Sequence, residues 1–360
     1  FTFSHITAEL VLKKINMLKS NKSCGYDKIS ARFLKAGKDV LCHNLAYMLN
    51  LSFDQSTFPS IFKHAEVSSI YKKSEALHKQ NYRPISVLTA FSKIQEGIMC
   101  DQMMSYFDNI LSRSLSAYRQ KYSCNNVLFE CINDWSAALD NKEYVACLLM
   151  DLSKAFDSLP HGLLISKMKA YGMDDKSCSF IHSYLTNRLQ RVKINSERSE
   201  WQCIKQGVPQ GSLAGPVLFN IFMNDFIYFI DNICDLYNYA DDNTLSFHHS
   251  NPHVIQTTLE NASSIAVNWF NDNYMQANPS KFQAIVLCGR NKHIDMNFHL
   301  NGHTIQTVSE VKLLGITIDE NLTFTPHVSL VCKKSAKQVN AMSRLSKSLS
   351  TVSKMKVLNA

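Results

Sequence analysis

Two adjacent aspartates lie between two short segments in which apolar and polar residues alternate, over residues 236–247. This alternation is typical of half-buried strands, and Asp-Asp-Asn at 241–243 favours a turn, so the stretch predicts a β-hairpin with Asp241 and Asp242 at its tip. Side chains of consecutive strand residues point to opposite faces, so both acids can face one site only if the turn redirects one of them. Taken alone, such a pair is also typical of a solvated loop.

A third acid, Asp151, ends the uncharged segment 144–150. That segment is long enough for one fully buried strand, which would hold the acid at the rim of the core. If this strand lies beside the hairpin, two or three carboxylates converge, and like charges that close require a cation between them. Oxygen ligands without a neighbouring His or Cys favour Mg²⁺ over Zn²⁺, and two such ions about 4 Å apart serve phosphoryl transfer.

The composition sets wider limits. The 360 residues suffice for one large domain or two, and the net charge of +8 is compatible with a polyanionic partner. No apolar run is long enough to cross a bilayer, so we expect no membrane partner. The eleven cysteines include no Cys-x-x-Cys pair, which favours buried thiols in a reducing, intracellular compartment. Because the first residue is Phe, we expect a region of a longer protein.

Four ordered motifs carry a resemblance to a known family. Asp-Leu-Ser-Lys-Ala-Phe-Asp at 151–157, Gln-Gly-Val-Pro-Gln-Gly-Ser at 206–212 and Tyr-Ala-Asp-Asp at 239–242 resemble the palm motifs of reverse transcriptases. Asn-Tyr-Arg-Pro-Ile-Ser at 81–86 is similar to the fingers motif of the non-LTR (LINE-type, jockey-like) retrotransposon branch. The resemblance covers nearly the whole chain, and the nucleus is the compartment that it implies.

The resemblance implies an α/β (α+β) fold of the right-hand polymerase type. It places the fingers and an N-terminal extension at residues 1–140, and a palm built on a split βαβ, ferredoxin-like sheet at 141–320. Residues 172–205 would return to the fingers, and 321–360 would begin a truncated thumb. The reverse transcriptase core would then span about residues 54–319.

The implied activity is RNA-directed DNA polymerisation by two-metal-ion nucleotidyl transfer. Asp151, Asp241 and Asp242 would be catalytic and, with the backbone carbonyl of Leu152, would hold two Mg²⁺ ions, with Mn²⁺ as the alternative. Lys281 is a candidate to protonate the pyrophosphate leaving group. The expected partners are an RNA template, a DNA primer and deoxynucleoside triphosphates, whereas protein partners are unknown.

Nucleotide contacts are implied for a second set of residues. Arg83 and one of Lys72 or Lys73 would bind the triphosphate, because Arg offers two donors to phosphate and Lys a point charge. Gln210 and Gly211 would touch the sugar and the templating pair. Phe156 would exclude a 2′-hydroxyl group. Three of these residues have a plainer interpretation: Lys72 and Lys73 would be solvated, and Phe156 would be a core aromatic.

Other segments allow two interpretations each. The basic turn 21–29 would contact the template or be a surface turn. The aromatics and cations of 118–123 would stack on nucleic acid or form an ordinary surface. Residues 188–194 predict a strand with its cations on one face, which either approaches phosphates or is an edge strand guarded by charge. Residues 311–319 predict one apolar strand similar to the primer grip, followed by a basic helical tail suited to duplex phosphates.

Local signals predict several elements directly. Thr7 is expected to cap a helix that carries Val11 and Ile15 on one face. Asp157 is expected to form structural hydrogen bonds rather than to hold metal. Two rival functions stay open at this point: a catalytically decayed RNA-binding remnant of a mobile element, and an RNA-templated polymerase or maturase of another class.

Overall fold

The central layer of the protein is a four-stranded antiparallel sheet in the order β11-β3-β9-β8, seen in a computed structural model that describes residues 1–72, 75–289, 293–345 and 348–358. Two helices connect its strands in the pattern βαββαβ, which confirms the expected split βαβ topology. The elements are β3 (Tyr144–Met150), α9 (Ala214–Ile230), β8 (Asp235–Tyr239), β9 (Asp242–His249), α10 (Pro252–Asp272) and β11 (Gln283–Leu287).

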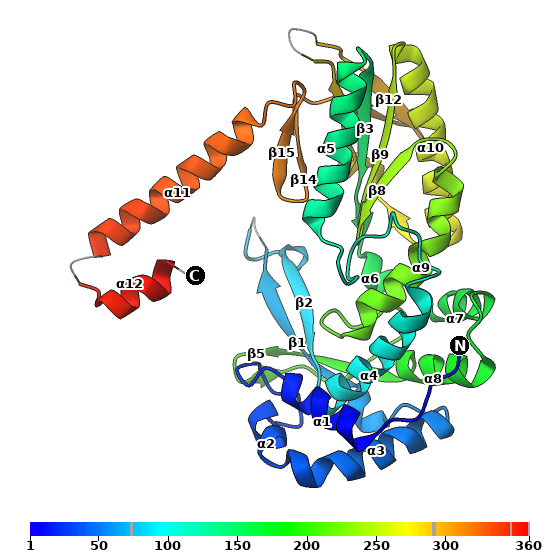
Figure 1. Cartoon of the computed structure of the whole chain (residues 1–360), viewed down its shortest axis with the longest axis vertical. Coiled ribbons are helices and arrows are strands. Elements are labelled where there is room, and N and C mark those ends of the chain that lie inside the picture. Colours follow the sequence, from blue (N-terminus) through cyan, green and yellow to red (C-terminus); the bar gives the residue numbers. More distant parts are fainter. Residues whose placement is uncertain (73–74, 290–292, 346–347, 359–360) are drawn as a thin grey trace.

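Both faces of this sheet are covered, which explains the uncharged sequence of β3. Val145 and Cys147 point to a core shared with helix α5 (Cys124–Asp140) and with the hairpin of β14 (Glu310–Leu313) and β15 (Ile316–Asp319). Ala146 and Leu148 point to the larger core under α9 and α10. Figure 1 shows α5 and α10 on either side of the strands. A strand buried on both faces needs apolar residues at every position rather than at alternate ones.

A second sheet lies in the lower part of the molecule in Figure 1, in the order β2-β1-β5-β6 with β7 also paired to β5. Its strands are β1 (His64–Tyr71), β2 (Tyr82–Val87), β5 (Arg188–Ile194), β6 (Glu197–Arg198) and β7 (Gln202–Ile204). The helices of this part are α1 (Ala8–Met17), α2 (Ala31–Ala36), α3 (Lys38–Asp54), α4 (Ala90–Phe107), α7 (His161–Ala170) and α8 (Asp175–Leu185). Thr7 caps α1 as predicted, because its hydroxyl oxygen accepts from the Leu10 N–H at 3.3 Å.

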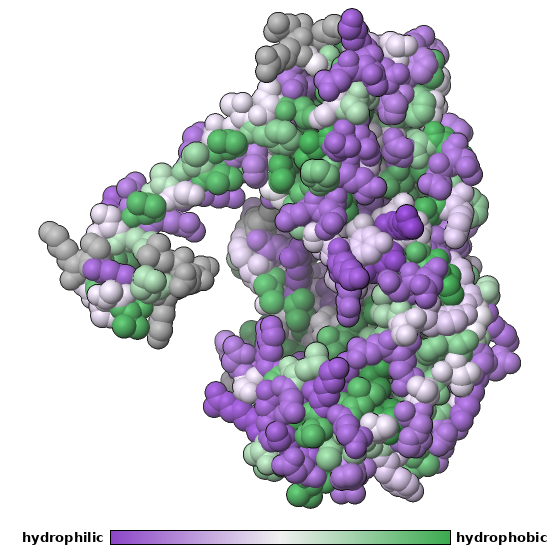
Figure 2. Space-filling view, in the orientation of Figure 1, coloured by the Kyte–Doolittle hydropathy of each residue, from purple (hydrophilic) through white to green (hydrophobic). Residues whose placement is uncertain are grey.

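The remaining elements are short, apart from a helix that extends from the body. They are the turns η1 (Ser60–Lys63), η2 (Lys79–Asn81) and η3 (Pro279–Lys281), the pair β4 (Leu152–Ser153) and β10 (Gln276–Ala277), α6 (Ala155–Ser158), the hairpin of β12 (Asn297–Leu300) and β13 (His303–Gln306), α11 (Thr325–Leu345) and α12 (Thr351–Leu358). No residue of α11 is buried, and Figure 2 shows hydrophilic and apolar side chains intermingled along this projecting helix. The domain limits proposed from the sequence stay a prediction.

The structure corrects the expectation for residues 188–194. Arg188 is buried, and one of its guanidinium nitrogens donates to the Tyr184 carbonyl at 3.0 Å, whereas Arg191 binds Glu66 at 2.6 Å. Residues three apart on a strand face opposite sides, so these cations cannot share one face. The edge-strand alternative is also wrong, since β5 lies between β1 and the strands β6 and β7.

Two further expectations are wrong. Residues 311–319 form the hairpin of β14 and β15 rather than one strand, because Leu314 and Gly315 adopt φ values of 46° and 94° and reverse the chain. Three of the cysteines, Cys24, Cys203 and Cys332, are exposed rather than buried. Within the described residues, no helix is both long and apolar enough to span a bilayer.

Candidate active site

The two acids of the hairpin flank a tight turn between β8 and β9. Tyr239 pairs with Asp242, so Ala240 and Asp241 alone form the loop, and Ala240 adopts φ 58°. Buried Asn238 donates from Nδ2 to the Ala240 carbonyl at 3.0 Å, and the side chain of Asn243 donates to the Asp241 carbonyl at 3.1 Å. These bonds fix the turn in the conformation in which both acids line one cavity.

Asp151 reaches the same cavity from the neighbouring strand. Met150, the last residue of β3, pairs with Asn243 of β9, so the next residue emerges beside the acid pair. The cavity has a volume of about 1080 Å³, and Asp151, Asp241 and Asp242 all line it. The three acids therefore line one cavity, and their shared hold on a metal ion stays a prediction.

The carboxylates affect each other's charge. Burial, together with repulsion from Asp151, raises the pKa of Asp241, which Arg83 and Lys72 partly oppose. Burial, with repulsion from both other acids, raises the pKa of Asp242 to about 6. Lys281, in η3, places its Nζ 3.4 Å from an Asp151 carboxylate oxygen. A site that disfavours its own negative charge in this way is suited to a cation.

The donor chemistry fits a divalent metal ion, although the side chains are not gathered into a ready-made cluster. Among the described residues, no three His, Cys, Asp or Glu side chains are placed so that they could hold an ion together. The three acids nevertheless offer only carboxylate oxygens, which suits Mg²⁺ or Mn²⁺ rather than Zn²⁺. Leu152 also lines the cavity, with its β4 segment paired to Ala277, and a ligand role for its carbonyl stays a prediction.

The predicted cations approach the acids from the other sheet. Arg83 pairs with Ile70 in the hairpin of β1 and β2, and the Lys72 N–H donates to the Asn81 carbonyl at 2.8 Å just beyond β1. Both residues line the cavity, and both lower the pKa of Asp241. Lys73, the alternative to Lys72, lies outside the described residues.

The glycine-containing loop forms another part of the wall. The backbone carbonyl of Gln210 accepts from the Ser86 N–H at 2.7 Å, which docks the loop on β2, and its side-chain amide donates to Asp157 at 2.9 Å. Asp157 thus makes the kind of structural hydrogen bond expected of it. Gly211 adopts φ 109°, and Gln210 and Gly211 both line the cavity.

Substituting alanine for Gly211 is expected to destabilise the protein and to reduce any activity of this cavity. An added Cβ would lie 2.8 Å from the Ser86 carbonyl oxygen, in a backbone conformation that side chains rarely adopt. We expect the free energy of unfolding in urea to fall by about 1–3 kcal/mol. Gly162→Ala is the matched control, because no atom lies within 4 Å of its added Cβ. Equal stability of the two variants would contradict the expectation.

Phe156 belongs to the core and also lines the cavity, and its role against a 2′-hydroxyl stays a prediction. Its half-buried ring stacks on Phe219 of α9 with centroids 4.5 Å apart, so it is part of the core. It also lines the cavity. Lys79 and Lys154, for which no role was predicted, line the cavity as well, together with Tyr118 of the segment 118–123. Lys154 lies within the motif at 151–157, whereas no local pattern distinguishes Lys79 from other surface lysines.

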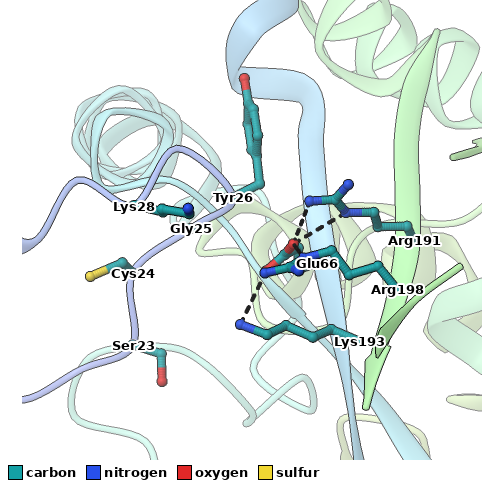
Figure 3. A pocket seen from close by; sticks show the side chains of 9 residues that line it. All are labelled: Ser23, Cys24, Gly25, Tyr26, Lys28, Glu66, Arg191, Lys193 and Arg198. Atoms are coloured by element: carbon teal, nitrogen blue, oxygen red, sulfur yellow. Dashed lines mark hydrogen bonds and ion pairs between the residues drawn. The ribbon is translucent and has the colours of Figure 1, made fainter. Parts of the chain in front are cut away.

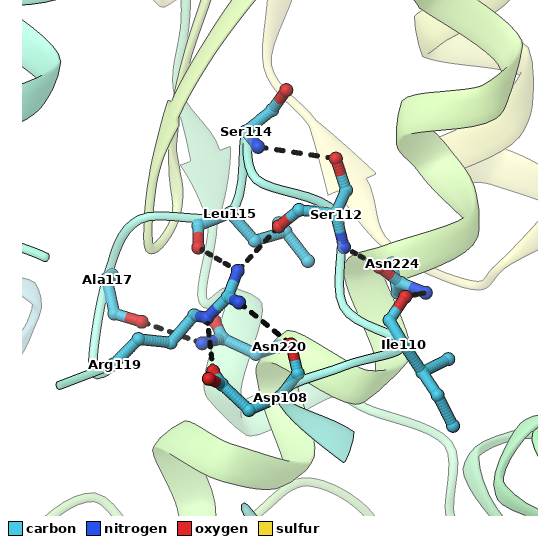
Figure 4. A network of polar contacts seen from close by, with 9 residues as sticks. All are labelled: Asp108, Ile110, Ser112, Ser114, Leu115, Ala117, Arg119, Asn220 and Asn224. Atoms are coloured by element: carbon cyan, nitrogen blue, oxygen red, sulfur yellow. Dashed lines mark hydrogen bonds and ion pairs between the residues drawn. The ribbon is translucent and has the colours of Figure 1, made fainter. Parts of the chain in front are cut away.

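Arg119 and Tyr118, adjacent in the segment 118–123, have different surroundings, and Figure 4 shows those of Arg119. Arg119 is buried and donates to Asp108 at 2.8 Å and to the carbonyls of Ser112, Leu115 and Asp108. A guanidinium bound in this way holds its own loop and is not available to nucleic acid. Tyr118, in contrast, is half-exposed at the cavity.

The basic turn 21–29 lines a second pocket of about 550 Å³ (Figure 3). Its centre is Glu66, which binds Arg191 and Arg198 and lies 3.6 Å from Lys193. Three cations around one carboxylate, with Lys28 also in the wall, leave an excess of positive charge. Tyr26 is an aromatic residue of the pocket wall, and the Arg191 guanidinium covers the ring of Trp201 behind it, 4.4 Å from the ring centre.

Residues 70–318 match the model of the family described as "Reverse transcriptase (RNA-dependent DNA polymerase)", so the chain belongs to this family. The mixed α/β fold, with acids at the strand ends of a split βαβ sheet, is thus a polymerase fold of the right-hand type. The reverse transcriptase family uses divalent metal ions.

Particular relatives come from mobile elements. The chain is 28% identical to the probable RNA-directed DNA polymerase from transposon BS of Drosophila melanogaster, over 91% of this chain and 37% of that protein. It is 26% identical to the RNA-directed DNA polymerase from mobile element jockey of the same species, over 95% of this chain and 38% of that protein. The chain therefore spans somewhat more than a third of these relatives. An apo telomerase structure from Candida tropicalis gives a TM-score of 0.49 at 14% identity, over 79% of this chain and 59% of the telomerase chain.

Proposed function

We propose that this chain is the catalytic region of an RNA-directed DNA polymerase from a non-LTR retrotransposon. The observation that carries the proposal is the convergence of Asp151, Asp241 and Asp242 in a cavity that Lys72 and Arg83 line from the other sheet. Acids that hold cations, facing basic residues that bind a triphosphate, are what nucleotidyl transfer requires. Membership of the family and the similarity to transposon polymerases support the same conclusion.

The residues of the cavity would have different roles in the reaction. Asp151, Asp241 and Asp242 would hold Mg²⁺, and we propose that two ions bind. When bound, the ions would neutralise charge on the attacking and leaving oxygens. Arg83 and Lys72 would bind the triphosphate and orient its α-phosphate towards the primer 3′-hydroxyl.

The other side of the nucleotide meets the remaining wall of the cavity. Phe156 would lie against the sugar, and Gln210 with Gly211 would support the base pair. Lys281 would donate a proton to the departing pyrophosphate, and its ion pair with Asp151 keeps its ammonium group at the site.

We propose an RNA template and a DNA primer as the macromolecular substrates. The pocket around Glu66 offers excess positive charge and the ring of Tyr26, and cations beside aromatic rings are a combination by which proteins hold single-stranded nucleic acid. It would contact the template strand. The basic residues of α11, namely Lys333, Lys334, Lys337 and Arg344, are all exposed and suit duplex phosphates.

Primer extension tests the function directly. The chain is mixed with an RNA template, an annealed DNA primer, deoxynucleoside triphosphates and Mg²⁺, and the lengthened primer is measured. A DNA template of the same sequence serves as the comparison. Extension on the RNA template supports the proposal. A protein that binds the template-primer but never extends it would instead be an RNA-binding remnant.

Magnesium is expected to stabilise the protein by an amount that depends on pH. The pKa of Asp242 is about 6 in the folded protein, above its ordinary value of 3.8. In the metal-free protein, the stabilisation that the protonated carboxyl group gives to the folded state is fully present below pH 3.8, and it is lost as the pH rises through about 6. Ions relieve this cost only where the acids are ionised. Thermal melting should therefore show a larger rise in Tm with Mg²⁺ at pH 8 than at pH 5.

The matched variant for this measurement is Asp241→Asn, which removes one negative charge with little change in shape. We expect it to lose most of the rise in Tm caused by Mg²⁺. An undiminished rise in the variant would contradict the assignment of the ion to this cavity.

A further inference from the structure

Tyr118 lies in the wall of the active-site cavity without belonging to any of the four motifs. Its ring meets Phe156 edge to face, with centroids 6.3 Å apart and an interplanar angle of 85°. The side chain is 50% exposed, so it faces the cavity rather than the core. Burial, together with repulsion from Asp241, raises the pKa of its phenol.

The backbone holds Tyr118 in an unusual conformation. Its φ is 60°, a left-handed value that costs bulky residues free energy and persists where neighbouring contacts enforce it. Figure 4 shows those contacts: Arg119 is bound on one side, and on the other the side-chain amide of Asn220 donates to the Ala117 carbonyl at 2.7 Å. Both neighbours of Tyr118 are therefore anchored, which orients its side chain.

Helix α9 supports the Phe156 ring directly through Phe219 and indirectly through the loop that carries Tyr118. Phe219 stacks on this ring at 4.5 Å, and the next residue of α9, Asn220, holds the loop that carries Tyr118. The ring of Phe156 thus lies between two aromatic contacts, which limits how far it can shift. A wall that excludes a 2′-hydroxyl must resist such a shift, because the group to be rejected is small.

We propose that Tyr118 is a positioning residue for Phe156, and that its ring helps the cavity to discriminate deoxyribonucleotides from ribonucleotides. This inference rests on the proposed function. Tyr118 would act through the ring of Phe156, not through its hydroxyl or by contact with the reacting atoms.

The experiment measures kcat/KM for a deoxyribonucleotide and for the ribonucleotide of the same base, on one RNA template with one primer. Tyr118→Ala is expected to lower the ratio of kcat/KM for the deoxyribonucleotide to kcat/KM for the ribonucleotide about three- to tenfold. This factor corresponds to the free energy of one edge-to-face ring contact. Tyr118→Phe keeps the ring and should retain the wild-type ratio. Tyr274→Ala is the matched control, because Tyr274 is also exposed with a positive φ of 57° but does not line the cavity. Thermal melting of each variant shows that it is folded.

A double-mutant cycle separates positioning from general damage. If Tyr118 acts through Phe156, then Tyr118→Ala should not change the ratio further in the Phe156→Val background. A wild-type ratio in Tyr118→Ala would overturn the inference, and so would an equal loss in Tyr118→Phe or an undiminished effect in the Phe156→Val background. If wild-type protein fails to extend the primer, the proposed function itself is overturned, which is a distinct result.

Discussion

Replacing Asp151 or Asp241 by asparagine is expected to lower primer extension by about a thousandfold or more. Asparagine keeps the shape of the side chain but removes the charge that a divalent ion needs, and the other acids of the cavity cannot supply it from their own positions. Single-turnover extension on an RNA template, with saturating nucleotide and Mg²⁺, measures the effect.

A control and a binding measurement make this prediction specific. Asp235→Asn changes an acid at the opposite end of the same hairpin strand, outside the cavity, and should leave extension within about twofold of wild type. Template-primer affinity should also be retained by both active-site variants, since the basic residues of the surface are unchanged. Extension that survives either active-site substitution would remove the metal assignment.

Phe156→Val is expected to admit ribonucleotides. Valine keeps an apolar side chain but cannot reach as far into the cavity, so the wall that would meet a 2′-hydroxyl recedes. We expect the preference for deoxyribonucleotides to fall by about 100-fold, the range over which an apolar wall typically rejects one hydroxyl group. Competing incorporation of the two nucleotides opposite one template base measures the change.

Phe129→Val provides the comparison for this variant, because Phe129 is exposed on α5 and lies outside the cavity. A wild-type preference in Phe156→Val would show that Phe156 serves the core alone. Equal use of both nucleotides by the wild-type protein would favour an RNA-templated polymerase of another class.

Short-range patterns predicted the elements that carry the acids. The uncharged run of β3 reflects burial of both its faces, which a sequence records residue by residue. The alternation around Asp241 located the two strands but wrongly predicted that they are half-buried, because the structure also buries their polar residues Asn238, Asn243 and Ser246. The turn at 314–315 was missed within a run of apolar residues, because Leu314 gives no turn signal of its own.

The surroundings of the charged side chains were harder to predict from the sequence than the positions of the buried strands. Arg119 and Tyr118 are adjacent in one basic, aromatic segment, yet the first is buried among carbonyl groups and the second faces the cavity. Arg188 is buried, whereas Arg191 neutralises Glu66. The partner of Arg191 lies 125 positions away in the chain, whereas Arg119 and Arg188 bind mainly backbone carbonyl groups 4 to 11 positions away. No sequence pattern identifies either kind of partner.

The sequence by itself determined which segments become strands and where acids stand at their ends, because burial and turn formation depend on near neighbours. Only the tertiary structure decided that these ends meet, since the pairing of β3 with β9 joins residues nearly a hundred positions apart. It also decided which aromatic and basic side chains face the shared cavity, because that depends on how the two sheets and α9 pack together.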